Sequence, residues 1–148
     1  MHPQTRAEAT SYRETSLHAD VMAFLSALAD RGDRRFHLTS FGVSPQGREL
    51  PLVVASAHGI KTPAESRARG LPVVQIINGI HAGEVGGKEA SMMLLRDLLD
   101  GAHGELLEHL TLVVVPLFNP DGNDALDPAN RALDLPNLAG QLGPAKVG

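Results

Sequence analysis

An apolar run that ends in a glycine-rich turn and continues into a helical pattern limits the folds open to this chain. It spans Ile76-Ile77-Asn78-Gly79-Ile80-His81-Ala82-Gly83-Glu84-Val85-Gly86-Gly87-Lys88-Glu89-Ala90. Residues 72–78 are apolar almost throughout, which is typical of a strand covered on both faces and flanked by parallel neighbours. Apolar residues then recur at helical spacing over residues 84–99. A strand, a turn and a helix in this order indicate an α/β fold.

Two further patterns supply the rest of the expected sheet. Residues 36–43 and 50–56 read as strands, and the turn 44–48 between them contains Pro and Gly, so the pair should form an antiparallel hairpin. Residues 110–117 form another apolar run that predicts a buried strand. Because the central strands look covered on both faces, we expect an α/β/α sandwich around a mixed, mostly parallel sheet.

The first part of the chain predicts one long helix. Residues 1–13 are polar and without period, so we expect a flexible N-terminus with the domain beginning at residue 14. Residues 14–30 carry apolar side chains at helical spacing, with Thr15 or Ser16 as the N-cap. The helix should therefore be amphipathic and pack on the sheet.

Two segments predict irregular structure. Residues 57–71 are rich in Gly, Pro, Lys and Arg and read as a surface loop. Beyond Asp124 the chain carries Pro, Gly and Asn with little apolar period, which is typical of a long surface excursion. Because no packed helix or strand closes the pattern, we expect residues 14–148 to be the N-terminal portion of an incomplete domain.

Composition excludes several functional classes. The net charge of -4 gives no electrostatic footprint for nucleic acid or an anionic membrane as a partner. The chain has no cysteine, so a metal site must be built from His, Asp or Glu. The N-terminus lacks the pattern of a signal peptide, and no apolar run approaches the roughly 20 residues that span a bilayer. We therefore expect a cytoplasmic location.

His81 and Glu84 are the candidate metal ligands. They follow a predicted buried strand at its carboxyl end, where open α/β sheets place their ligand crevices. An imidazole and a carboxylate three positions apart can both bind one zinc ion, although pairs with this spacing also occur by chance. A phosphate loop at Gly87-Lys88 is excluded, because Ala82 stands in place of its first glycine and Glu89 in place of its Ser or Thr.

Three motifs in order resemble the zinc carboxypeptidase family of metallopeptidases. They are the segment Gly79-Ile80-His81-Ala82-Gly83-Glu84, the later Pro116-Leu117-Phe118-Asn119-Pro120-Asp121-Gly122, and the earlier hairpin Pro45-Gln46-Gly47-Arg48-Glu49-Leu50-Pro51-Leu52. The resemblance implies an α/β/α sandwich and a peptidase that shortens peptides or proteins at their C-terminus. It also implies that His81 and Glu84 are two of the three protein ligands of a catalytic Zn²⁺.

Other parts of the family pattern are not found in this chain. In the family, the third ligand, a His, lies well downstream of the Asn-Pro-Asp-Gly turn, as do an Asn-Arg pair that grips the substrate carboxylate and a general-base Glu. Asn130-Arg131 is a candidate for the carboxylate clamp, but it comes sooner after Asp121 than the family pattern requires, and a pair that anchors the loop is the alternative. We therefore expect the isolated chain to be inactive.

Two alternative functions stay open. A deacylase of the aspartoacylase or succinylglutamate desuccinylase type also uses a His-x-x-Glu pair but acts on N-acyl amino acids. The Asn-Pro-Asp-Gly turn at residues 119–122 favours the peptidase. The other alternative is a non-catalytic domain that keeps the sheet as a binding scaffold.

Overall fold

The hairpin at the start of the sheet is confirmed. The computed structural model describes residues 2–127, in which β1 (Phe36–Val43) and β2 (Glu49–Ala55) pair antiparallel. Phe36 lies opposite Ala55 and Leu38 opposite Val53, so these apolar residues share one face of the sheet. The hairpin therefore contributes one apolar face to the core.

The two remaining strands complete a mixed sheet with the order β1-β2-β4-β3. β4 (Thr111–Val115) is antiparallel to β2, and β3 (Val73–Ile77) is parallel to β4. The predicted α/β class with a mixed sheet is confirmed. Among the described strands, however, only one pairing of the three is parallel, because the hairpin enters the sheet antiparallel to β4.

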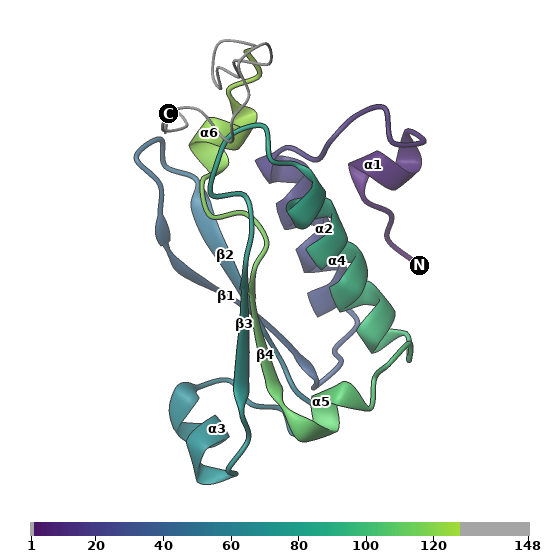
Figure 1. Cartoon of the computed structure of the whole chain (residues 1–148), viewed down its shortest axis with the longest axis vertical. Coiled ribbons are helices and arrows are strands. Elements are labelled where there is room, and N and C mark those ends of the chain that lie inside the picture. Colours follow the sequence, from purple (N-terminus) through teal and green to yellow (C-terminus); the bar gives the residue numbers. More distant parts are fainter. Residues whose placement is uncertain (1, 128–148) are drawn as a thin grey trace, which may run out of the picture.

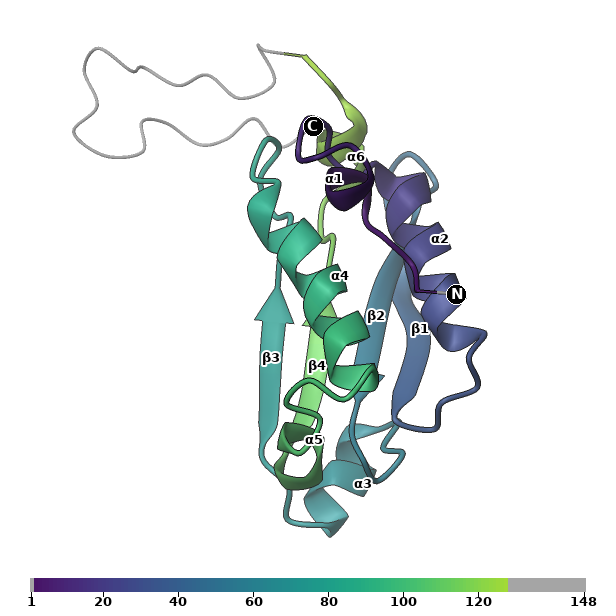
Figure 2. The ribbon, with the colours of Figure 1, turned by 90° about the vertical axis from the view of Figure 1, so that its right-hand side faces the viewer.

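Two helices, α2 (His18–Ala29) and α4 (Gly86–Leu99), cover one face of the sheet (Figure 2). Their buried side chains meet those of the strands in a single apolar core. The core includes Val21, Phe24, Leu25, Leu28, Val53, Met92, Leu95, Leu98, Leu112 and Val114. Within residues 2–127, the views of the ribbon show no helix running along the opposite face (Figure 1). One helical layer of the predicted sandwich is thus present in the described part of the chain.

The prediction that β3 is buried on both sides is wrong for the described residues. β3 pairs with β4 and forms an edge of the sheet. Leu112 and Val114 of β4 face the helices, so the alternate residues Thr111 and Val115 point to the opposite face. Val73 and Ile77 pair with these two residues and therefore also lie on the face away from the helices. Their exposed fractions are 51% and 41%. An apolar run therefore marks the strand correctly but not the number of its neighbours.

The N-terminal segment packs more closely than expected. A short helix, α1 (Arg6–Ala9), lies beside α2 (Figure 2) and buries Ala7. Glu8 forms an ion pair with Arg96 of α4 at 2.7 Å. These contacts attach α1 to the helical layer of the domain.

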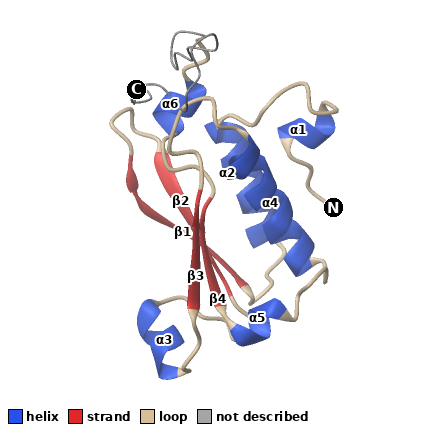
Figure 3. Ribbon diagram, viewed as in Figure 1, coloured by secondary structure: helices blue, strands red, loops and turns tan. Residues whose placement is uncertain are grey.

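Three short helices occupy the connections. α3 (Pro63–Ala68) lies within the segment predicted to be a loop, where Thr62 and Glu65 form a capping box. α5 (Leu106–His109) precedes β4, and α6 (Pro120–Asp124) follows it, so that the two lie at opposite ends of the sheet (Figure 3). The long helix α2 is expected from the sequence to begin at residue 14. In the structure it begins at His18, and its N-cap is Leu17 rather than Thr15 or Ser16.

Candidate metal centre

The candidate ligands lie on the segment that joins β3 to α4, at the carboxyl end of β3. The Nδ1 atom of His81 is 3.2 Å from the Oε2 atom of Glu84. Both side chains are partly open to solvent, with 38% and 47% of their surface exposed. The structure therefore brings the two predicted ligands together at an accessible position.

The separation of these two atoms suits a zinc ion. Two ligand atoms that each lie about 2.0 to 2.2 Å from a tetrahedral zinc ion are roughly 3.3 to 3.6 Å apart, close to the 3.2 Å between His81 and Glu84. A nitrogen and a carboxylate oxygen are also ligand types that zinc accepts. In the structure the same contact is a hydrogen bond, which zinc would replace. The residues present therefore fit part of a zinc site by donor type and separation.

The turn before His81 needs glycine. Gly79 has φ of +61°, a left-handed conformation that side chains disfavour. A Cβ atom there would lie 2.7 Å from Cδ1 of Leu117. Glycine thus lets the segment that carries His81 and Glu84 bend directly over the chain that leaves β4.

Backbone hydrogen bonds extend the pairing of β3 and β4 into this turn. Asn78 donates to the carbonyl of Val115 and accepts from the amide of Phe118, both at 2.9 Å. The amide of Asn119 donates to the carbonyl of Gly79 at 2.9 Å. The segment that carries His81 is therefore fixed at its start to the Asn-Pro-Asp-Gly turn.

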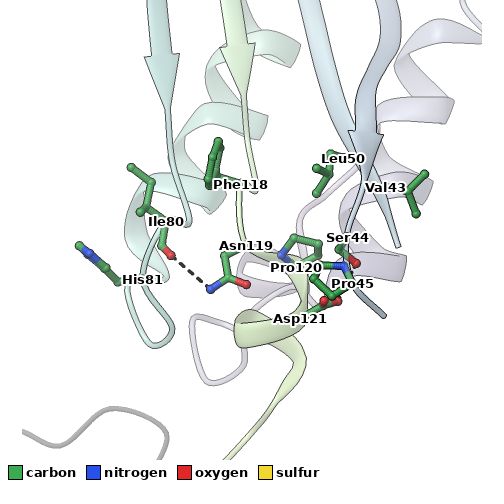
Figure 4. A pocket seen from close by; sticks show the side chains of 10 residues that line it. All are labelled: Val43, Ser44, Pro45, Leu50, Ile80, His81, Phe118, Asn119, Pro120 and Asp121. Atoms are coloured by element: carbon green, nitrogen blue, oxygen red, sulfur yellow. Dashed lines mark hydrogen bonds between the residues drawn. The ribbon is translucent and has the colours of Figure 1, made fainter. Parts of the chain in front are cut away.

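The side chain of Asn119 adds a second link. Its Oδ1 accepts from the amide of Gly122 at 3.0 Å and so caps α6, whereas its Nδ2 donates to the carbonyl of Ile80 at 3.4 Å (Figure 4). Ile80 directly precedes His81. The turn motif is thus bonded to the residue that precedes the candidate ligand His81.

Asp121 of the same turn joins it to the hairpin. Its buried carboxylate accepts from Oγ of Ser44 at 2.8 Å, the amide of Gln46 at 3.1 Å and Nη1 of Arg48 at 2.6 Å. Burial raises the pKa of Asp121, but the hydrogen bonds from Ser44 and Arg48 prevail and hold it below its ordinary value. The three sequence motifs therefore meet in space.

Two hollows of similar size adjoin at His81. One, of about 410 Å³, is lined by polar groups that include Asn78, Glu84 and the backbone of Gly87. The other, of about 390 Å³, is mostly apolar and lies between the hairpin and the turn. Its lining residues are Val43, Ser44, Pro45, Leu50, Ile80, His81, Phe118, Asn119, Pro120 and Asp121. The first hollow contains the candidate ligands.

The rest of the expected site is not assembled within the described residues. Among residues 2–127, no group of three or more His, Asp or Glu side chains could hold a metal ion. Arg131, the candidate carboxylate clamp, lies outside the described residues. The assignment of His81 and Glu84 as ligands stays a prediction.

Sequence reasoning missed two sets of charged residues near the site that are wholly or partly buried. One is the ion pair of Asp121 with Arg48, and the other consists of Lys88 and Glu89 in the first turn of α4. Neither has a local signal, because their partners lie far away along the chain. The described residues also contain no helix of the length and apolarity that a membrane span requires.

Comparisons with known proteins identify relatives of this chain. The family model of zinc carboxypeptidases matches residues 21–133. Carboxypeptidase M of Mus musculus is 29% identical over 109 residues, which are 70% of this chain and 24% of that protein. Carboxypeptidase 2 of Trichophyton equinum is 32% identical over 91 residues, which are 59% of this chain and 16% of that protein.

A solved structure shows the same fold. Carboxypeptidase A from Helicoverpa armigera superposes with a TM-score of 0.65 at 22% identity, over 74% of this chain and 26% of that one. This chain thus spans about a quarter of the length of the mouse relative and of the insect structure. From its sequence match over residues 21–133, we conclude that the chain belongs to the zinc carboxypeptidase family.

Proposed function

We propose that this chain carries part of the active site of a zinc-dependent metallocarboxypeptidase, an enzyme that removes the C-terminal residue of a peptide. The observation that carries the proposal is the 3.2 Å approach of His81 Nδ1 to Glu84 Oε2 at the carboxyl end of β3. Membership of the family and the names of the relatives support it.

The two side chains have distinct tasks in this proposal. His81 provides a neutral nitrogen donor through Nδ1, and Glu84 provides a negatively charged oxygen donor. Bound zinc supplies Lewis-acid polarisation of the scissile carbonyl. The hollow of about 410 Å³ around Glu84 leaves room for the substrate to approach. Arg131 is proposed to bind the terminal carboxylate of the substrate, since a guanidinium group can pair with it bidentately.

The isolated chain should bind zinc weakly. Catalytic zinc sites hold three protein ligands, whereas His81 and Glu84 supply two. We therefore expect measurable zinc binding but little or no peptide hydrolysis from residues 1–148 alone.

Calorimetric titration with zinc tests the ligand assignment. The wild-type chain is compared with His81→Ala, Glu84→Ala and the control His58→Ala, whose ring nitrogen bonds to the carbonyl of Glu108 rather than to the site. We expect His81→Ala and Glu84→Ala to lose most of the binding heat and His58→Ala to retain it. Identical titrations for all four proteins would remove the basis for the proposal.

A substrate comparison with the complete protein tests the reaction. A peptide with a free C-terminus should be shortened by one residue, and the same peptide with an amidated C-terminus should react far more slowly, because it lacks the carboxylate that Arg131 is proposed to bind. Hydrolysis of N-acyl amino acids without cleavage of either peptide would instead support the deacylase alternative.

A further inference from the structure

Two oppositely charged residues in the first turn of α4 are buried. Lys88 is fully buried and Glu89 is 5% exposed. Lysine and glutamate are seldom buried unless they find partners, and burial of their charges is unfavourable without hydrogen bonds. Their partners therefore show what the first turn of α4 is attached to.

Both residues bind Ser16. The Oε1 atom of Glu89 accepts from the amide of Ser16 at 2.6 Å and from Oγ1 of Thr15 at 2.8 Å, while Oε2 accepts from Oγ of Ser16 at 3.1 Å. The Nζ atom of Lys88 donates to the carbonyl of Ser16 and to Oδ1 of Asn123 in α6. Ser16, itself fully buried, is held at its amide, hydroxyl and carbonyl groups by the two charged side chains.

This arrangement, which we call the Ser16 clamp (Ser16, Lys88, Glu89 and Asn123), anchors the first turn of α4. The N-cap residue of α4 is Val85, whose side chain makes no capping hydrogen bond. Charged side chains of the first turn instead tie the helix to two neighbouring segments through charge-assisted hydrogen bonds. The clamp therefore determines where α4 begins relative to the rest of the domain.

The segment of residues 80–85, which carries His81 and Glu84, lies between this clamp and a second attachment at residues 78 and 79. At its start, residues 78 and 79 bond to the chain that follows β4. At its end, α4 begins at Gly86, two residues after Glu84. The backbone contact inside the segment joins the amide of Glu84 to the carbonyl of His81 at 3.3 Å. The hydrogen bond between the His81 and Glu84 side chains therefore lies between two fixed ends of the chain.

We propose that Lys88 is a positioning residue for the metal pair: through the Ser16 clamp its buried ammonium group fixes the start of α4 and thereby holds Glu84 beside His81. This inference rests on the proposed metal role of His81 and Glu84. Lys88 does not touch the metal ion or the substrate in this role and acts through the backbone between residues 84 and 88. Groups that bond directly to metal ligands change metal affinity by about 10- to 100-fold when they are removed, and Lys88, which bonds to neither ligand, should fall at the low end of this range.

Three variants of the 148-residue chain test the proposal. Lys88→Met removes the charge but keeps the length of the side chain. Lys61→Met makes the same substitution at an exposed position. Leu107→Ala removes a fully buried core side chain of α5, at the end of the sheet opposite α6, and controls for a general loss of stability. Zinc affinity is measured by calorimetry at a temperature at which every variant is folded, and amide hydrogen exchange is measured without zinc.

The expected result is selective. Lys88→Met should weaken zinc binding about tenfold and speed exchange of the Glu84 and Glu89 amides, while exchange of the Asn78 amide at the other anchor stays as in wild type. Lys61→Met and Leu107→Ala should keep the wild-type zinc affinity. Wild-type zinc affinity in Lys88→Met would overturn the proposal, as would an equal loss of affinity in Leu107→Ala.

The exchange measurement separates this inference from the proposed function. If neither the wild-type chain nor His81→Ala binds zinc, the metal assignment fails, and exchange at Glu84 and Glu89 decides the anchoring role. Faster exchange at these two amides in Lys88→Met alone would still support that role. Unchanged exchange would overturn it.

Discussion

Adjacent glycines at the start of α4 should respond in opposite ways to the same substitution. Gly86 and Gly87 are the first two residues of the helix, and neither has a positive φ. A Cβ atom on Gly86 would meet nothing within 4 Å, whereas a Cβ atom on Gly87 would lie 2.3 Å from Oδ1 and 2.9 Å from Cγ of Asn78. The pair separates helix propensity from steric fit within one turn.

The magnitudes follow from these contacts. Replacing glycine by alanine at a compatible helical position stabilises a protein by about 0.5 to 1 kcal/mol, and this gain applies to both sites. At Gly87 the Asn78 side chain must also move, and overpacking of this kind costs about 1 to 3 kcal/mol. Gly86→Ala should therefore raise the free energy of unfolding, and Gly87→Ala should lower it or leave it little changed, with a difference of about 1 to 3 kcal/mol between the variants.

Urea denaturation followed by circular dichroism measures this difference, and thermal melting should separate the variants by roughly 2 to 4 °C per kcal/mol. Adding Asn78→Ala to Gly87→Ala removes the two atoms that clash and leaves only Cβ of residue 78 at 3.4 Å. Gly87→Ala should therefore lower the free energy of unfolding much less in the Asn78→Ala background than in the wild-type background. Equal stabilisation by Gly86→Ala and Gly87→Ala would refute the steric argument.

Two further predictions concern buried and half-buried carboxylates. Burial raises the pKa of Glu8, but hydrogen bonds from Arg96 prevail and hold it below 4.5. The ionised Glu8 carboxylate therefore stabilises the folded state above pH 4.5, and this contribution is lost as the pH falls through the lowered pKa. The urea midpoint of the wild-type chain should therefore fall more steeply between pH 5 and pH 3 than that of Glu8→Gln, and parallel curves would contradict the argument. Asp121→Asn removes the charge that holds the hairpin turn, so the amide of Gln46 should exchange faster in hydrogen-exchange experiments while most amides of α2 do not change. Uniform acceleration across the chain would instead indicate global destabilisation.

The hairpin and the two long helices could be predicted because their signals are local. Alternation in residues 36–43 and the Pro-Gly turn at 44–48 determine a two-strand unit without reference to the rest of the chain. The capping box of α3 was also a local signal, since Thr62 and Glu65 have the required spacing. It was missed because the composition of residues 57–71 suggested a loop.

Features that depend on distant residues could not be predicted in the same way. Thr15 and Ser16 have the side chains of helix caps, but their hydroxyl groups bond to Glu89, more than seventy residues away. Likewise, the apolar run of β3 indicated a strand but not its place at an edge of the described sheet. For Thr15 and Ser16, a tertiary contact outweighs the local preference for capping a helix. For β3, the position in the sheet is determined by tertiary pairing rather than by the sequence of the strand.

The candidate site shows the same division between local signal and distant support. The spacing of His81 and Glu84 identifies the pair, whereas the contacts with the chain after β4 and the Ser16 clamp, which flank the pair and are proposed to position it, join distant parts of the chain. The separation of 3.2 Å between His81 Nδ1 and Glu84 Oε2 is close to that expected for two ligands of a tetrahedral zinc ion. Weak binding by the isolated chain would then reflect the number of ligands rather than their geometry. A loss of zinc affinity in Lys88→Met that Leu107→Ala does not share would consequently report the geometry of the pair, since both variants keep the two ligands.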